Sequence, residues 1–142
     1  MFFGTYEYII DQKGRVTIPP KFRGSFKGGI VLFRGYDKCV NVCTVVEWDK
    51  RAEHLSRQPV TQSKTRRLNR ATFSSAFSLD LDGQGRVVLP ATLRQYAGVT
   101  SDVVIAGVRD CLEIWSKEDW LAEQQLMSER VWQIAESIED RT

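Results

Sequence analysis

The stretch "DQKGRVTIPPKFR" at residues 11–23 returns in altered form as "DGQGRVVLPATLR" at residues 82–94. The identical positions, each pair 71 residues apart, are Asp11 and Asp82, Gly14 and Gly85, Arg15 and Arg86, Val16 and Val87, Pro19 and Pro90, and Arg23 and Arg94. The match continues at an offset of 72 residues as far as Trp48 and Trp120. A match of this extent indicates that a whole structural unit is duplicated.

Both copies predict the same order of short elements. An apolar run, "TYEYII" or "AFSLDL", precedes the Asp, and a β-branched run, "RVTIP" or "RVVLP", follows the Gly, which predicts a β-hairpin in each copy. The prolines then open a short helical turn, and the second of these turns is expected to end at Gly98. Two more strands follow in each copy, "GIVLFRG" with "CVNVCTV" and "DVVIAGV" with "CLEIW". The pattern predicts the α+β class.

A helix is expected after each pair of strands. Thr44 with Glu47, and Ser116 with Asp119, have the spacing of a capping box. In the second helix an apolar stripe advances by three or four residues from Trp120 to Ile138. Such a stripe packs either on its own domain or on another subunit, and the sequence leaves both open.

A basic segment joins the two copies. After a break at Pro59, four cations are expected on one short helix: Lys64, Arg66, Arg67 and Arg70. They form either an additional phosphate-facing patch or a solvated, subunit-bridging helix. The predicted division is a first unit at residues 1–58, a connector at residues 59–72 and a second unit at residues 73–142.

Composition limits the classes of protein to consider. The chain has 142 residues, 42% of them hydrophobic, which is enough for a core. Charges interrupt every long apolar stretch and no leader pattern is present, so we expect a cytoplasmic protein without a membrane segment. Three cysteines at this spacing predict reduced core residues, and the single histidine, His54, is expected on a helix surface.

Charge is distributed unevenly along the chain. Residues 1–72 carry 14 Lys and Arg against 6 Asp and Glu, whereas residues 73–142 carry 6 against 12. The first half therefore has a net charge of +8 and the second half −6. This asymmetry favours a polyanionic partner for the first half, although chance segregation of surface charge would give the same count.

The repeated loops differ at the positions between Asp and Arg. The first presents Gln12 and Lys13 beside Arg15, whereas the second has Gly83 and Gln84 beside Arg86. Five residues are expected to organise the two turns: Asp11, Gly14, Asp82, Gly85 and Arg86. Amide and cationic side chains together suit base edges and phosphates, and Arg is suited to bidentate contact with guanine.

Catalytic and metal-binding roles find little support. The segment from Asp80 resembles the start of a calcium loop but has Ala91 where a bidentate Glu is required. No complete dinucleotide or P-loop motif occurs. Asp80 and Asp82 could share one face of a strand, but no nucleophile or histidine accompanies them. We therefore predict neither an enzyme nor a cofactor.

The two D-x-x-x-R loops, the start "MFFGTYEYIIDQKGRVTIPPKFR" and the connector "RRLNRATFSSA" resemble the MraZ family of AbrB-like, swapped-hairpin DNA-binding domains. The resemblance implies two tandem AbrB-like swapped-hairpin β-barrel units forming one pseudo-twofold module, with helices after each unit. It also implies a bacterial transcription factor that forms rings, associates with the nucleoid and binds tandem repeats upstream of the division and cell-wall gene cluster, which usually includes its own gene.

Carried over to this chain, the resemblance places DNA contacts at Lys13 and Arg15, with Gln12 next. The second loop, with Gln84 and Arg86, is expected to be mainly structural. Phe2-Phe3 stands where relatives often have a basic residue before the glycine, which removes a phosphate contact near Gly4. The alternative is a ring-forming structural or protein-interaction module with only nonspecific affinity for double-stranded DNA.

Overall fold

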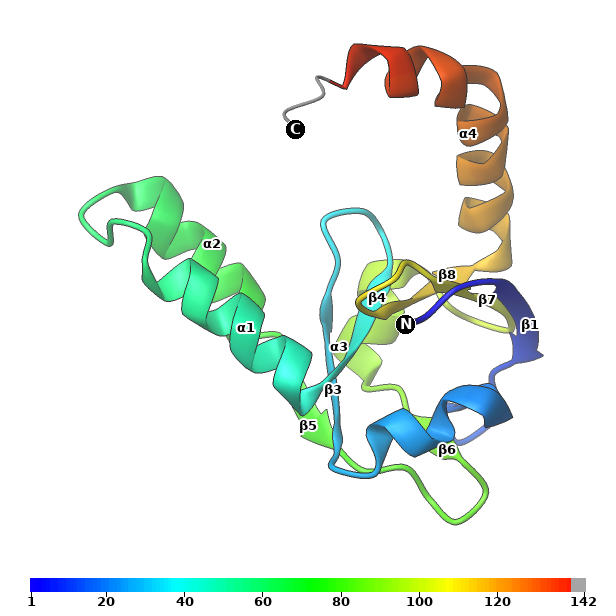
Figure 1. The fold of residues 1–142 in the computed structure, drawn as a ribbon. Helices are drawn as coiled ribbons and strands as arrows, with labels where there is room; N and C mark the ends of the chain where they lie inside the picture. Colours follow the sequence, from blue (N-terminus) through cyan, green and yellow to red (C-terminus); the bar gives the residue numbers. More distant parts are fainter. Residues whose placement is uncertain (139–142) are drawn as a thin grey trace.

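The computed structural model describes residues 1–138. The first half contains β1 (Thr5–Ile9), β2 (Arg15–Thr17), η1 (Pro20–Phe26, a 3-10 helix), β3 (Ile30–Arg34), β4 (Val40–Thr44) and α1 (Val45–Ser56). The second half contains α2 (Ser63–Phe73), β5 (Phe77–Leu79), β6 (Arg86–Val88), α3 (Ala91–Ala97), β7 (Asp102–Gly107), β8 (Leu112–Ser116) and α4 (Lys117–Ser137). Figure 1 shows their arrangement. The α+β class and the tandem units are confirmed; residues 139–142 of the expected second unit lie outside the described part.

The strands form one open six-stranded sheet and one two-stranded ribbon. The order in the sheet is β1-β7-β8-β4-β3-β5, and the ribbon pairs β2 with β6. Because β1 of the first unit pairs with β7, and β5 of the second unit pairs with β3, the two halves exchange strands. The sheet is not closed, since β1 and β5 remain as its edges.

The expected local hairpins are wrong in their pairing. The Asp11–Arg15 turn forms, with its Asp11 N–H donating to the Arg15 carbonyl at 3.1 Å, but β2 then pairs with β6 and not with β1. Val16 and Ile18 are both fully buried, so the alternation along this strand indicates which of its faces points into the core. It does not select the neighbouring strand, which here comes from the other unit.

The exchange gives the molecule a pseudo-twofold axis. In the ribbon, Val16 lies opposite Val87, which is its equivalent in the repeat. At the centre of the sheet, Asn41 lies opposite Glu113, and these two residues are also equivalent. The core fills the space between the sheet, the ribbon and the short helices; its fully buried members include Ile18, Leu32, Leu89, Leu93, Ile105 and Ile114.

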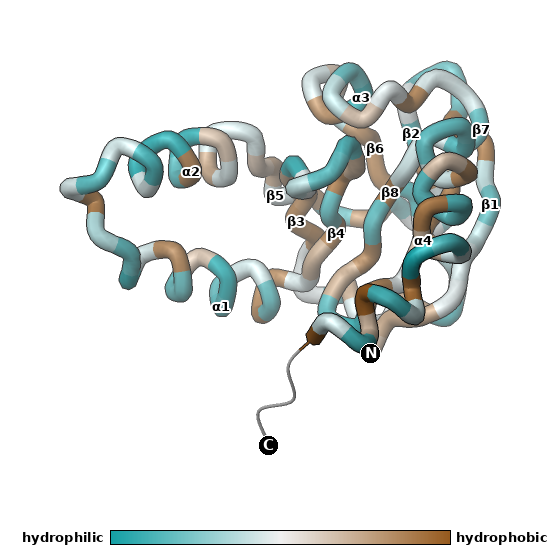
Figure 2. The backbone as a smooth tube through the Cα atoms, turned by 90° about the horizontal axis from the view of Figure 1, so that it is seen from above, coloured by the Kyte–Doolittle hydropathy of each residue, from teal (hydrophilic) through white to brown (hydrophobic). Residues whose placement is uncertain are grey.

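Helices α1 and α2 form an arm that extends from the body (Figures 1 and 2). Its base is aromatic: the Trp48 ring packs 4.8 Å from Phe33 and 5.5 Å from Phe73, measured between centroids. Pro59 lies in the loop between the helices, as expected from the break in the sequence. The connector expected at residues 59–72 covers this loop and most of α2, and its limits stay a prediction.

Helix α4 projects from the body beyond its first turns (Figure 1). Trp120 packs against Trp115 with centroids 5.7 Å apart, but no residue of α4 is buried. The stripe is exposed, with 38% exposure at Met127, 47% at Val131 and 50% at Ile134. Only the start of the stripe, at Trp120, packs on its own domain, and the part from Met127 to Ile138 is not covered by the chain itself. Among residues 1–138, no helix has the length and apolarity needed to cross a membrane.

The expected helix caps are present. Glu47 N–H donates to Thr44 Oγ1 at 3.2 Å, and Asp119 N–H donates to Ser116 Oγ at 3.1 Å. Gly98 ends α3 with a left-handed φ of 66°. Each cap satisfies a backbone group that a helix end leaves without an internal partner.

Candidate nucleic-acid interface

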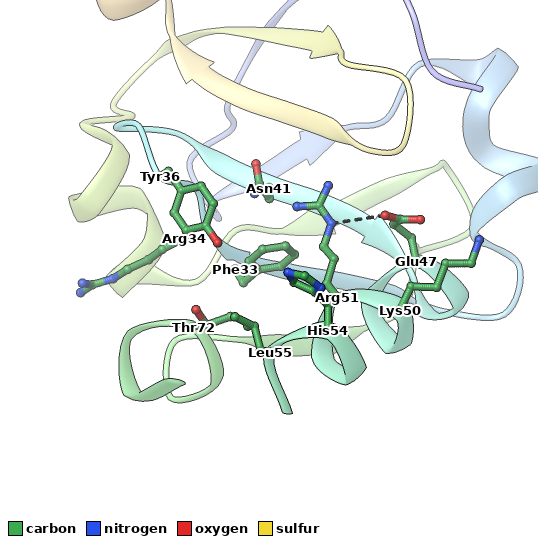
Figure 3. A pocket seen from close by; sticks show the side chains of 10 residues that line it. All are labelled: Phe33, Arg34, Tyr36, Asn41, Glu47, Lys50, Arg51, His54, Leu55 and Thr72. Carbon is green, nitrogen blue, oxygen red and sulfur yellow. Dashed lines mark hydrogen bonds and ion pairs between the residues drawn. The ribbon is translucent and has the colours of Figure 1, made fainter. Parts of the chain in front are cut away.

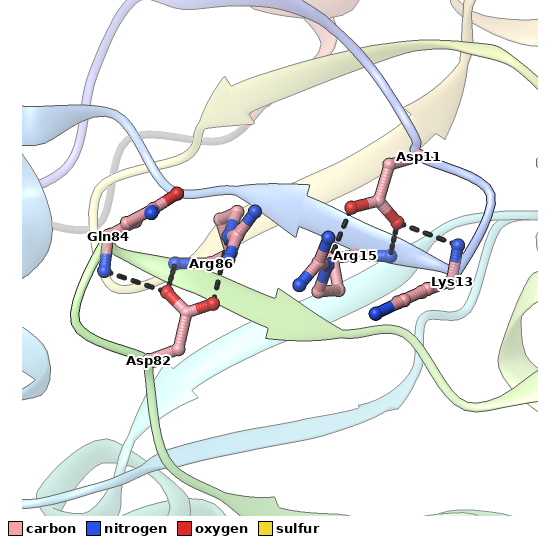
Figure 4. Close-up of polar contacts among 6 residues, drawn as sticks. All are labelled: Asp11, Lys13, Arg15, Asp82, Gln84 and Arg86. Carbon is pink, nitrogen blue, oxygen red and sulfur yellow. Dashed lines mark hydrogen bonds and ion pairs between the residues drawn. The ribbon is translucent and has the colours of Figure 1, made fainter.

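The two D-x-x-x-R loops are built from the same hydrogen bonds (Figure 4). Asp11 Oδ1 accepts from the N–H groups of Lys13 at 2.9 Å and Arg15 at 2.8 Å, while Oδ2 accepts from Arg15 Nε at 2.6 Å. Asp82 repeats this pattern with Gln84 N–H, Arg86 N–H and Arg86 Nε at 2.9, 2.9 and 2.8 Å. Each carboxylate therefore fixes both the backbone of its turn and the direction of the following Arg.

A glycine completes each turn. Gly14 N–H donates to the Asp11 carbonyl at 3.0 Å, and Gly85 N–H donates to the Asp82 carbonyl at 3.0 Å. Their φ angles of 78° and 75° lie in the left-handed region that L side chains disfavour. The expected organising residues, Asp11, Gly14, Asp82 and Gly85, thus sit at the positions that set the loop shape.

The pKa of each loop carboxyl is lowered. For Asp11 and Asp82 the largest cause is the hydrogen bond from the backbone N–H of Arg15 or Arg86, to which the guanidinium adds. Both effects favour the ionised carboxylate. The carboxylates therefore act on the turns in their charged form at neutral pH.

The β2–β6 ribbon carries one loop at each end (Figure 4). Arg15 lies opposite Val88, and Thr17 lies opposite Arg86. Because side chains alternate along a strand and Val16 and Val87 face the core, these four residues share the outward face. A two-stranded ribbon has the width to enter the major groove of B-DNA, where Arg side chains contact base edges and phosphates.

The two ends of the ribbon differ in charge. At the first end Gln12 and Lys13 are exposed, and Lys13 makes no ion pair with any residue in the described part of the chain. At the second end Gly83 and Gln84 occupy the equivalent positions and provide no cation. The first end is therefore better suited to a phosphate or a base edge.

Sequence reasoning missed a second pair of cations at these loops. A Cβ on Gly14 would lie 2.5 Å from Arg94 Nη1, and one on Gly85 would collide with the Arg23 side chain. Each Arg crosses from the helical turn of one unit to the loop of the other. Arg23 and Arg94 occupy identical positions in the two copies of the repeated stretch, and this identity could have drawn attention to them. Their position beside the loops, however, depends on the strand exchange.

The connector cations do not join this cluster. Lys64, Arg67 and Arg70 are exposed on α2, which belongs to the arm and lies apart from the β2–β6 ribbon (Figure 2). Arg67 and Arg70 line a hollow with Thr92 and Leu93, at the junction of α2 with α3. Arg66 Nη1 donates to the carbonyls of Val60 and Thr61, at 2.9 and 3.1 Å, and so holds the loop between the two arm helices. A phosphate contact at these residues stays a prediction and would require a partner that reaches the arm.

One chain that supplies both strands of a shared ribbon, with matching turns at its ends, defines a duplicated module of the swapped-hairpin class. A family model described as an antitoxin-like "MraZ protein" matches residues 1–71 and again residues 72–140. Two proteins of Dehalococcoides mccartyi, each named "Transcriptional regulator MraZ", are 49% and 48% identical to this chain and align over at least 98% of each sequence. A protein of the same name from Natranaerobius thermophilus is 41% identical over 99% of this chain and 98% of its own length. The chain belongs to the MraZ family.

Proposed function

We propose that this protein is a sequence-specific DNA-binding transcriptional regulator. The observation that carries the proposal is the outward face of the β2–β6 ribbon, where Arg15 and the exposed Lys13 stand beside an ordered turn. The Asp11 carboxylate holds Arg15 in one direction, which lowers the conformational cost of binding a base edge. The names of the relatives agree with a regulatory role.

In this proposal the first loop reads DNA and the second is mainly structural. Lys13 and Arg15 make the principal contacts, and Gln12 assists them. The connector cations contribute to phosphate binding where the DNA reaches the arm: Lys64, Arg66, Arg67 and Arg70. The target is a set of short tandem repeats upstream of the division and cell-wall gene cluster, including the gene for this protein. The protein acts in the cytoplasm, on the nucleoid.

Assembly into a ring forms part of the same proposal. The exposed stripe on α4, with Met127, Val131 and Ile134, provides an apolar surface that its own chain does not cover. A ring repeats the first loop at intervals, so weak contacts to successive boxes add through effective concentration. The second candidate function, a structural ring with only nonspecific DNA affinity, rests on this same exposed stripe.

Fluorescence anisotropy with the full-length protein tests the proposal. The probe is a duplex from the region upstream of the gene, compared with a scrambled duplex of equal length at low and near-physiological salt. Preference for the native duplex that persists as salt rises supports sequence readout. Equal binding to both duplexes that vanishes with salt favours the structural ring.

A further inference from the structure

Three buried thiols lie on or next to the two adjoining strands β4 and β8 and have no part in the proposed DNA contacts. Cys39, Cys43 and Cys111 are free, and none is more than 2% exposed. Cys43 and Cys111 belong to one small apolar cluster with Val31 and Phe33, on the side of the sheet covered by α1. They therefore share a face and a packing environment.

Cys43, in β4, and Cys111, immediately before β8, lie one step beyond the last pair of the β4–β8 register. In the β4–β8 pair, Asn41 lies opposite Glu113 and Val42 opposite Leu112, so one further step brings the two cysteines together. Opposite residues of an antiparallel pair have Cα atoms about 4.5–5.5 Å apart, which lies within the range of about 4.4–6.8 Å found across disulfides. Their shared cluster and the hydrogen bond between the two thiols place the sulfur atoms within reach of each other. Cys39 continues the register in the other direction and falls opposite Trp115.

Arg51 distinguishes the two thiols chemically. Its Nη2 donates to Cys111 Sγ at 3.4 Å from α1. The hydrogen bond from the Cys43 thiol and the Arg51 charge both lower the pKa of Cys111. The same hydrogen bond and burial raise the pKa of Cys43. Cys111 is therefore the thiol that more readily becomes a thiolate, and Cys43 is the neighbour positioned to trap it after oxidation.

A cavity reaches the Arg51 guanidinium. It has a volume of about 250 Å³ and lies between the arm and the sheet, with Phe33, Asn41, Arg51 and His54 in its wall (Figure 3). One water molecule occupies roughly 30 Å³ of liquid volume, so a molecule of the size of hydrogen peroxide fits with room to spare. A small neutral oxidant can thus come next to the group that holds the Cys111 sulfur.

We propose that Cys43 and Cys111 form a peroxide-oxidised dithiol that links the two units covalently. The Cys111 thiolate attacks one oxygen of hydrogen peroxide, the O–O bond breaks, and the departing hydroxide takes up a proton to become water. The Cys43 sulfur then displaces hydroxide from the Cys111 sulfenic acid, and its own thiol proton leaves with that hydroxide as a second water. Two thiols are oxidised, and one peroxide is reduced to two waters.

The bond would join the halves at their central seam. β4 belongs to the first unit and β8 to the second, and the two strands adjoin in the middle of the six-stranded sheet. A cross-link between residues 43 and 111 closes a long loop and so lowers the conformational entropy of the unfolded chain. We expect it to raise the melting temperature by roughly 10 °C. Transient, redox-sensing disulfides of this kind are the ones expected in a reducing compartment.

Oxidation of the full-length protein tests the assignment directly. Reduced protein is treated with hydrogen peroxide, remaining thiols are blocked with iodoacetamide, and a non-reducing digest is analysed by mass spectrometry. We expect a cross-linked peptide containing Cys43 and Cys111, and a rise in melting temperature that dithiothreitol reverses. Cys39→Ala should retain the cross-link and Cys111→Ala should lose it. Absence of this cross-link in the native sequence, or a cross-link through Cys39, would overturn the proposal.

The rate of thiol oxidation tests the role of Arg51. Arg51→Met keeps a side chain of similar length but removes the charge, and it should slow the loss of thiols to peroxide by about 3–10-fold. Arg57→Met removes an exposed cation next to the end of the same helix, which pairs with Glu53 and lies outside the cavity wall, and it should leave the rate unchanged. Equal rates in both variants would show that Arg51 does not activate Cys111, and the proposed order of the steps would be wrong.

Discussion

Arg94 of the second unit lies over Gly14 of the first, so that a Cβ at Gly14 would stand 2.5 Å from Arg94 Nη1. The equivalent relationship joins Arg23 to Gly85, and Arg23 Nε also donates to the Ile18 carbonyl at 3.0 Å. Each turn therefore packs against a guanidinium from the opposite unit, and the carbonyls of Gly14 and Gly85 accept from the N–H groups of Leu89 and Ile18 across the ribbon at 2.7 and 2.9 Å. The shape of each loop depends on the other half of the molecule as well as on its own residues.

Gly14→Ala should destabilise the protein. The change places a side chain at a φ of 78° and against Arg94, and we expect a loss of about 1–3 kcal/mol in the free energy of unfolding. Gly83→Ala, in the second loop, is the matched control, because its φ is not in the left-handed region and a Cβ there meets nothing within 4 Å. Urea unfolding of both variants measures the difference; equal midpoints would show that the close approach is not maintained in solution.

The contacts of Arg23 and Arg94 with the loops could not be predicted from the sequence alone. Local chemistry predicts the turns at Asp11 and Asp82 and the helix caps at Thr44 and Ser116, and all of them are present. The duplication is visible in the sequence itself. Strand partners do not follow from it, because the period of two in each strand specifies the buried face and not the neighbour. The loops could thus be predicted from the sequence, whereas the approach of Arg23 and Arg94 depends on the exchange.

The stability provided by the loop carboxylates should depend on pH. The pKa values of Asp11 and Asp82 are lowered in the folded protein, so their contribution is fully present above the unfolded value of about 3.9 and is lost as the pH falls through the lower folded value. Asp82→Asn should therefore be less stable than the native sequence near neutral pH, and the gap should close in strong acid. Urea midpoints across this range give the test. A gap independent of pH would mean that the charge on Asp82 does not hold the turn.

Assembly should depend on the exposed stripe of α4. Val131→Asp places a charge in the middle of this surface, where Val131 is 47% exposed in the single chain. We expect a smaller particle by light scattering, with a change of no more than about 0.5 kcal/mol in the stability of the chain itself. Gln133→Asp adds the same charge at an exposed position outside the stripe and should preserve the native mass. A mass unchanged by Val131→Asp would exclude the stripe as the subunit contact.

Arg15 and Arg86 offer a comparison within one molecule. Each makes an ion pair with its loop carboxylate, at 2.6 and 2.8 Å, and their side chains are 26% and 25% exposed. Alanine at either position therefore removes a similar structural contact. If the first loop reads DNA, Arg15→Ala should weaken specific binding by about 1–3 kcal/mol, and Arg86→Ala should have a smaller effect. Fluorescence anisotropy measures the affinity of both variants for the native duplex. Equal losses of affinity would assign the effect to loop structure or to both loops, and not to a contact made by the first loop alone.

Lys13 provides the test of phosphate contact, because its equivalent in the second loop is the uncharged Gln84. A Lys that neutralises one phosphate releases counterions on binding, so Lys13→Ala should lower the slope of log affinity against log salt by about 1. Gln84→Ala removes an exposed side chain of similar size without removing a charge, and its slope should equal that of the native protein. Both side chains sit on turns held by the same hydrogen bonds to Asp11 or Asp82, so neither change alters loop closure. An unchanged slope for Lys13→Ala would place the phosphate contacts elsewhere, and the exposed cations of α2 would become the next residues to substitute.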